Sequence, residues 1–166
     1  MKISIIAVGR ISNSFESDLV NRYINRFNKI NKLIGLSQLP IIEVDDNKYK
    51  TKQQQAKKIL EIIKTETKIV IFDQKGKSIS SENFTKYLIN QRDSGVKKLV
   101  FIIGGAFGLC RRLYKESNEI FSLGKMIWPH FLVRVMVTEQ IYRSASIILG
   151  NPYHKNWINV RAKNEW

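Results

Sequence analysis

The sequence predicts a single α/β domain with a mostly parallel sheet flanked by helices, and three observations support this fold class. Short apolar runs rich in Ile and Val alternate with longer amphipathic segments, which is typical of parallel sheets. Several of the apolar runs end at a glycine. The length of 166 residues suits one hydrophobic core, and no repeat, low-complexity segment or linker divides it.

In the first half of the chain, three apolar runs are expected to be strands: Lys2–Gly9, Leu39–Val44 and Thr67–Lys77. Between the first two, Ser14–Lys29 repeats apolar residues at every fourth position, which predicts a helix with Ser14 as its N-cap. A polar connection at 45–54 and a helix through Ala56–Ile63 lead to the third strand.

In the second half, three more helices are expected: Ser81–Gly95, Gly108–Asn118 and Phe131–Leu149. The first is capped by Ser81 and has Gly95 at its C′ position. The apolar run Lys97–Gly105 is a fourth strand. The segment Ser122–His130 then interrupts the alternation of strands and helices, because its apolar residues follow neither the period of a strand nor that of a helix.

Charge is the strongest signal in the composition. Lys and Arg number 28 against 14 acids, a net charge of +14, so we expect a polyanionic partner bound by a basic surface that folding assembles. The single cysteine and two histidines, without ligand spacing, predict no metal site and no internal disulfide. No apolar run approaches the length of a membrane span, and the first residues fit a strand better than a leader, so a cytoplasmic location is expected.

The turn "GGAFG" after the fourth strand is not a nucleotide-binding fingerprint. It has the spacing G-G-x-x-G, lacks an acid about 20 residues further on, and is not followed by G-K-[ST]. Two explanations of its glycines stand side by side. They serve the tight packing of the turn itself, or they let a ligand lie against the backbone.

Three stretches, "IIGGAFGL", "SLGKMIWPHFLVRVMVTEQIYRSASI" and "NPYH", together resemble the RlmH family of SPOUT methyltransferases. The resemblance covers residues 1–155 as one domain and leaves 156–166 as an extension. It implies a C-terminal trefoil knot, which no periodicity could reveal. It also implies S-adenosylmethionine as methyl donor and N3 of a pseudouridine in 23S ribosomal RNA of the assembled ribosome as acceptor.

The resemblance places the cofactor among three loops: Phe72, Gly104, Gly105, Leu123, Gly124, Lys125, Met126, Ile127 and Trp128. Backbone groups would hold its polar parts and the apolar side chains would form walls. The alternative for the apolar residues is ordinary core packing. For Lys125 the alternative is a solvated side chain without a ligand contact. His130 is expected to have a structural role.

The acceptor nitrogen lies between two carbonyls and must lose a proton, which a nearby cation and a positioned base would favour. Arg143, Tyr153 and His154 are the catalytic candidates, the last two because the resemblance brings the terminal Tyr-His pair into the active site. An ion pair with Glu139 is the alternative role of Arg143. Arg134 and Lys155 are candidate RNA contacts. The alternative role of Arg134 is a contact with a partner subunit.

The expected partners are the ribosome and a second copy of the chain. A wide apolar stripe on the helix Phe131–Leu149 supports a homodimer, which the resemblance also implies. Residues 156–166 are expected to pack on their own or the neighbouring subunit. Two competing functions remain: methylation of another rRNA or tRNA nucleotide, and RNA binding without catalysis.

Overall fold

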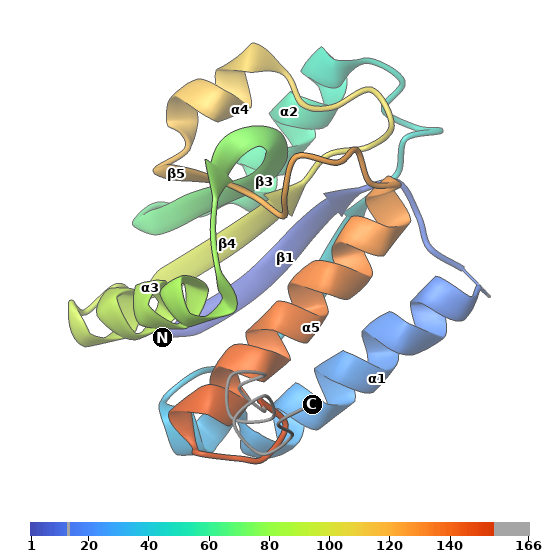
Figure 1. Cartoon of the computed structure of the whole chain (residues 1–166). Coiled ribbons are helices and arrows are strands. Elements are labelled where there is room, and N and C mark those ends of the chain that lie inside the picture. The colour runs from blue at the N-terminus through green and yellow to red at the C-terminus, as the bar shows by residue number, and fades with distance from the viewer. Residues whose placement is uncertain (13, 155–166) are drawn as a thin grey trace.

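The computed structural model describes residues 1–12 and 14–154, and it shows a five-stranded sheet between two layers of helices (Figure 1). All strand pairs are parallel, and the strand order is β2-β1-β4-β3-β5. The elements are β1 (Lys2–Val8), α1 (Phe15–Ile30), the 3-10 helix η1 (Asn31–Ile34), β2 (Ile41–Val44), α2 (Lys52–Ile62), β3 (Thr67–Ser78), α3 (Ser81–Asp93), β4 (Lys98–Ile103), α4 (Arg111–Glu116), β5 (Glu119–Ser122) and α5 (His130–Ile148). The predicted α/β class is therefore confirmed.

Alternate residues of each strand face opposite helix layers. In β1, Ile5 packs into the core formed with α1, α3 and α5, whereas Ile6 packs into the core formed with α2 and α4. Figure 1 shows α5 and α1 side by side on one face and α2 beside α4 on the other. Both faces are covered, which explains why the central strands are apolar throughout.

Local sequence signals account for the helix starts. Ser14 caps α1 as predicted, because its hydroxyl accepts a hydrogen bond from the Ser17 amide at 3.3 Å. Thr51 and Gln54 form a reciprocal capping box at α2. At α3 the cap is Ser80 rather than the predicted Ser81, whose hydroxyl instead donates to Gln140 at 2.7 Å.

Strand β5 was not expected from the sequence. It contains only four residues, two of them apolar, and it exists because it pairs with β3 at the edge of the sheet. Between Phe72 and Lys77 the β3 register jumps while its partner stays at Phe121, so residues 73–76 bulge out of the strand. At Gly76 an added Cβ would lie 2.7 Å from the carbonyl oxygen of Ile120, so only glycine fits.

Because all five strands run in the same direction, their carboxyl ends meet at one edge of the sheet. Phe72 within β3 and the loops after β4 and β5 carry the residues that the resemblance assigned to the cofactor, and open parallel sheets bind ligands at this edge. The knot stays a prediction. No helix within the described ranges is both long and apolar enough to cross a membrane.

Candidate functional site

A cavity of about 640 Å³, here called the loop cleft, lies at the carboxyl ends of β3, β4 and β5. Eight of the nine predicted cofactor residues line it: Phe72, Gly104, Gly105, Leu123, Gly124, Met126, Ile127 and Trp128. The ninth, Lys125, is exposed beside it and is not part of the wall. Three chain segments that are far apart in sequence thus converge as the resemblance implied.

The glycine turn after β4 is held together by its own close contacts. An added Cβ at Gly105 would lie 3.0 Å from Cγ1 of Val8, and one at Gly104 would lie 3.1 Å from Cγ of Leu109. The amide of Gly108 donates to the carbonyl of Gly105 at 2.9 Å. Tight packing therefore explains both glycines, and the turn also presents backbone at the cleft wall.

The third wall is an exposed loop whose start is fixed by one serine. The hydroxyl of Ser122 donates to the carbonyl of Gly124 at 2.7 Å and accepts from its amide at 3.2 Å. Beyond it, Met126 and Ile127 are 67% and 82% exposed. Core packing does not explain such exposed side chains, so the alternative considered for them is wrong for these two residues.

Among the described residues that line the loop cleft, Asp73 is the only carboxylate. Its Oδ2 accepts a hydrogen bond from the Tyr114 hydroxyl at 2.7 Å, and its Oδ1 accepts from the Lys75 amide at 2.8 Å. Burial and then this carboxylate raise the pKa of Tyr114 to about 12. Neither residue was expected from the sequence, because a contact between positions 73 and 114 has no local signal.

A second cavity of about 520 Å³, here called the tail cleft, lies between α3, α5 and the end of the described chain. Arg143 and Tyr153, two of the three catalytic candidates, line it. Nη2 of Arg143 lies 2.6 Å from Oε1 of Glu139, and the same oxygen accepts from the Tyr153 hydroxyl at 3.0 Å. The ion pair with Glu139, considered as the alternative role of Arg143, is present, and Arg143 still lines the cavity.

His154 joins this network at its edge. Its Nδ1 lies 3.4 Å from Nη1 of Arg143, and its Nε2 lies 3.4 Å from Oε1 of Glu82. The Tyr153 ring lies under the Arg143 guanidinium at 4.9 Å. Contacts from α3 and α5 thus hold the end of the described chain.

The pKa values of Tyr153 and Arg143 are both raised in this network. Burial, followed by hydrogen bonding to Tyr23 and the charge of Glu139, raises the pKa of the Tyr153 hydroxyl. Burial works against the charged form of Arg143, but the hydrogen bond and charge of Glu139 outweigh it and raise its pKa. Arg143 is therefore a fixed cation and Tyr153 a neutral hydrogen-bond donor at neutral pH.

The two clefts share part of their walls. Phe72, Leu123 and Gly124 line both the loop cleft and the tail cleft. Phe72 is buried and packs on the rings of Phe84 and Phe101, so this shared wall is anchored in the core. A ligand in one cleft thus lies across this wall from a ligand in the other.

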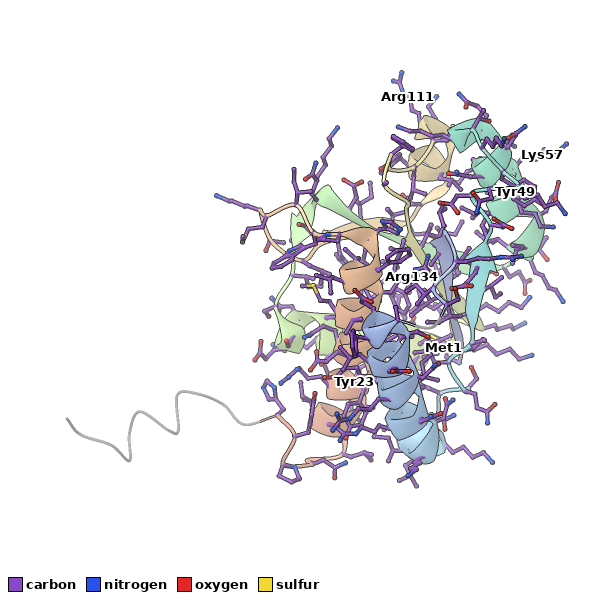
Figure 2. The ribbon with its side chains drawn as sticks, turned by 90° about the vertical axis from the view of Figure 1, so that its right-hand side faces the viewer. Met1, Tyr23, Tyr49, Lys57, Arg111 and Arg134 are labelled. Carbon is purple, nitrogen blue, oxygen red and sulfur yellow. The ribbon has the colours of Figure 1, made fainter. Side chains whose placement is uncertain are left out.

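Arg134 occupies a different place from the one the sequence suggested. Its side chain is 1% exposed, and Nη2 donates to the carbonyls of Val8 and Gly9, both at 2.6 Å. Nη1 donates to Oε1 of Glu43 at 2.8 Å. Figure 2 shows Arg134 in the interior of the molecule. A guanidinium enclosed in this way offers no face to an RNA phosphate, which contradicts the expected RNA contact at Arg134.

Two other expectations concern residues near these groups. His130 is partly buried at the start of α5, and burial and then Arg134 lower its pKa, which fits the structural role expected of it. Lys155 and the extension 156–166 lie outside the described residues. Among residues 1–12 and 14–154, no group of His, Cys, Asp and Glu is arranged to hold a metal ion.

Comparison with known proteins gives consistent matches over nearly the whole chain. Residues 1–154 match the family described as "Predicted SPOUT methyltransferase". A protein of Roseobacter denitrificans named "Ribosomal RNA large subunit methyltransferase H" is 42% identical over 156 residues, which are 94% of this chain and all of the relative. Proteins with the same name from Cereibacter sphaeroides and Rhizobium etli are 40% and 38% identical, each over 93% of this chain and 99% of the relative.

Proposed function

The chain belongs to the SPOUT methyltransferase family, and from this we propose that it methylates N3 of a pseudouridine in large-subunit ribosomal RNA, with S-adenosylmethionine as methyl donor. The names of the relatives support the substrate class. The observation that carries the proposal is that the loop cleft and the tail cleft adjoin at Phe72, Leu123 and Gly124, because methyl transfer needs neighbouring sites for donor and acceptor.

The loop cleft suits the methyl donor. Its volume of about 640 Å³ is in the range of cofactor sites, and its walls combine backbone at Gly104 and Gly105 with apolar side chains of the exposed loop. The carboxylate of Asp73 is held in place by Tyr114 and is an acceptor for ribose hydroxyls or an ammonium group. When bound, S-adenosylmethionine supplies an electrophilic methyl group on a positive sulfur.

The tail cleft suits the methyl acceptor. The Arg143 cation stabilises the anion that N3 becomes when its proton leaves. His154 is the group we propose to accept that proton, and the Tyr153 ring offers a surface on which an unstacked base can stack. Glu139 holds both Arg143 and Tyr153 by hydrogen bonds, so the acceptor side is organised before the base arrives.

We further propose that the protein acts as a homodimer on the assembled ribosome, in the cytoplasm where ribosomes are found. Exposed apolar side chains on α1 and α5 support the dimer: Phe15 is 87% exposed, Leu19 38% and Leu132 37%. On a two-fold axis the same patch would cover its own copy. Light scattering at micromolar concentration should give twice the 19.3 kDa chain mass.

The decisive experiment is mass spectrometry of large-subunit RNA from a strain that lacks the gene. Loss of one methyl group from a pseudouridine, restored by the plasmid-borne gene, is expected. Purified protein should also transfer labelled methyl groups to ribosomes from that strain and not to free tRNA. Efficient methylation of free tRNA with inactive ribosomes would overturn the proposed substrate. Absence of cofactor binding in calorimetry would overturn the enzymatic function itself.

A further inference from the structure

The loop cleft carries more positive charge than its proposed cofactor explains. Lys52, Lys75 and Arg111 line it, and all three side chains belong to exposed residues. The sole acid in the lining, Asp73, is already engaged by the hydroxyl of Tyr114. Within the described part of the chain, no ion pair involves any of the three cations. Their charge is therefore available to a ligand.

S-adenosylmethionine does not account for these cations. It carries a sulfonium and an ammonium against a single carboxylate, so its net charge is positive. Three cations around a positive ligand cost binding free energy unless a second, anionic ligand shares the site. The chemistry at the mouth of the loop cleft thus indicates a polyanion next to the methyl donor.

The three cations lie at the edge of a larger basic face formed by α2 and α4. We define the basic face by the exposed cations of three segments, those before and on α2, on α4, and in the bulge of β3: Lys48, Lys50, Lys52, Lys57, Arg111, Arg112, Lys115 and Lys75. Figure 1 shows α2 and α4 side by side over one face of the sheet, and Figure 2 shows Lys57 and Arg111 at that end of the molecule.

Acids are scarce on this face. Residues 47–60 contain five lysines and no acid, and residues 106–116 contain three cations and one acid, Glu116 at the end of α4. Glu61, at the far end of α2, pairs with Lys58 at 3.6 Å. A continuous field of one sign attracts and orients a polyanion, whereas the interspersed charges of an ordinary soluble surface do not.

We propose that the basic face binds the phosphate backbone of the RNA substrate beside the target nucleotide, and that Lys52, Lys75 and Arg111 contact the phosphates nearest the methyl donor. This inference rests on the proposed function. The lysines contact phosphate as point charges, and the Arg111 guanidinium can donate two hydrogen bonds to one phosphate. Such contacts fix the position of the RNA backbone without reading its sequence. Base recognition is then left to the tail cleft on the other side of the shared wall.

The test compares two triple variants that each remove three unpaired surface charges. The test variant is Lys52→Gln, Lys75→Gln and Arg111→Gln. The control is Lys2→Gln, Lys64→Gln and Lys68→Gln, which are exposed at the opposite, amino-terminal end of the strands. Both variants are measured for thermal unfolding, for S-adenosylmethionine affinity by calorimetry, and for binding to ribosomes from the deletion strain between 50 and 200 mM salt, about the range over which phosphate contacts dominate affinity.

The test variant is expected to bind S-adenosylmethionine at least as tightly as the wild type, because three cations beside a positive ligand are removed, and to lose at least about tenfold in ribosome affinity at low salt. The slope of log affinity against log salt should fall by about two to three units, since each lost phosphate contact removes about 0.7 to 0.9. The control variant should match the wild type in all three measurements. Methyl transfer by the test variant should recover at high ribosome concentration.

Each contrary outcome is distinguishable. An unchanged salt slope with full ribosome affinity would overturn the inference while leaving the proposed function intact. A lower affinity with an unchanged slope would mean that the face contacts a protein and would also overturn it. If the wild type neither binds nor methylates ribosomes, the proposed function fails first. If the control variant loses as much as the test variant, the effect is one of net charge and the basic face has no special role.

Discussion

The hydroxyl of Tyr153 donates a hydrogen bond to Oε1 of Glu139, and this oxygen is also the one that Arg143 contacts at 2.6 Å. One carboxylate thus orients two residues of the proposed acceptor site. It also ties the end of the described chain to the middle of α5. Glu139 itself was considered in the sequence only as a helix ion-pair partner, so its position at the centre of the network is a result of the structure.

Glu139→Gln is expected to lower methyl transfer at least about tenfold, because the neutral amide weakens the hold on both Arg143 and Tyr153. Cofactor affinity should change little, since Glu139 lines only the tail cleft. Single-turnover transfer to ribosomes and calorimetry measure the two quantities. Glu116→Gln, an exposed acid on α4, is the matched control and should behave as the wild type.

His154→Ala is expected to reduce methyl transfer at least about tenfold, with cofactor affinity nearly unchanged, because the imidazole lies on the acceptor side. His154→Gln separates the two roles of the ring. If His154 accepts the proton, the glutamine variant stays slow and loses the acidic limb of the pH–rate profile. If the ring only holds Arg143 in place, glutamine restores much of the rate. A fully active His154→Ala enzyme would remove His154 from the mechanism.

Truncation after Lys155 is expected to leave methyl transfer intact, because the family resemblance ends there. Transfer assays and light scattering on the shortened chain measure activity and association together. A folded, dimeric truncated protein without activity would show that residues 156–166 take part in the reaction.

Arg134→Lys is expected to destabilise the fold by about 3 kcal/mol, at the lower end for broken buried pairs because Glu43 is 32% exposed. A single ammonium cannot reproduce the fork that reaches Val8, Gly9 and Glu43 together. Urea unfolding measures the change. Arg22→Lys, an exposed position on α1, should cost less than about 0.5 kcal/mol.

Gly76→Ala is expected to loosen the pairing of β3 and β5, because the added methyl group would meet backbone atoms of Ile120 and Phe121 at 2.7 Å. The consequence is a lower unfolding temperature and weaker S-adenosylmethionine binding, since both strands end at the loop cleft. Lys77→Ala, at the exposed neighbouring position of β3 and outside the cleft lining, should leave both unchanged. Equal unfolding temperatures for the two variants would contradict the packing argument.

His130 predicts an acid sensitivity of the fold. Its pKa lies below the ordinary 6.5, first through burial and then through the charge of Arg134, while Asp46 acts in the opposite direction. The unfolded chain therefore takes up the proton first as pH falls. Stability that is complete above about pH 6.5 is lost as pH falls toward the lower folded pKa. Between pH 7.5 and 5, about the span of this titration, the unfolding free energy of His130→Asn should fall less than that of the wild type.

Much of the fold could be read from the sequence because its signals are local. The runs of β1, β3 and β4 and the period of α1 need no tertiary information, and Ser14 marks a helix start by itself. Strand β5 could not be read, because four residues with two apolar ones carry no period and only pairing with β3 defines them.

Part of the candidate site could likewise be predicted from the sequence, and part of it only the structure shows. The resemblance supplied the loops of the loop cleft and the Tyr153–His154 pair. The structure places Tyr153 in the wall of the tail cleft and His154 outside that wall, beside Arg143. It did not reveal the Asp73–Tyr114 contact, because nothing in either sequence neighbourhood points to the other. Arg134 was misread for a related reason: an arginine on a helix is usually solvated, and only the backbone carbonyls at the end of β1 make its burial favourable.

The position of β1 in the sheet has a consequence for how the chain acquires its structure. β1 pairs on one side with β2, but on the other side with β4, so Ile5 meets Phe101 across 95 residues of intervening chain. During synthesis the apolar β1 segment emerges first and its second edge stays open until residues 98–103 have followed. Such non-local pairing closes a long loop before it gains contacts, which slows folding and lengthens exposure of an aggregation-prone edge. We expect refolding to be slow for a domain of this size. We also expect chaperones to bind the amino-terminal half of the chain during synthesis.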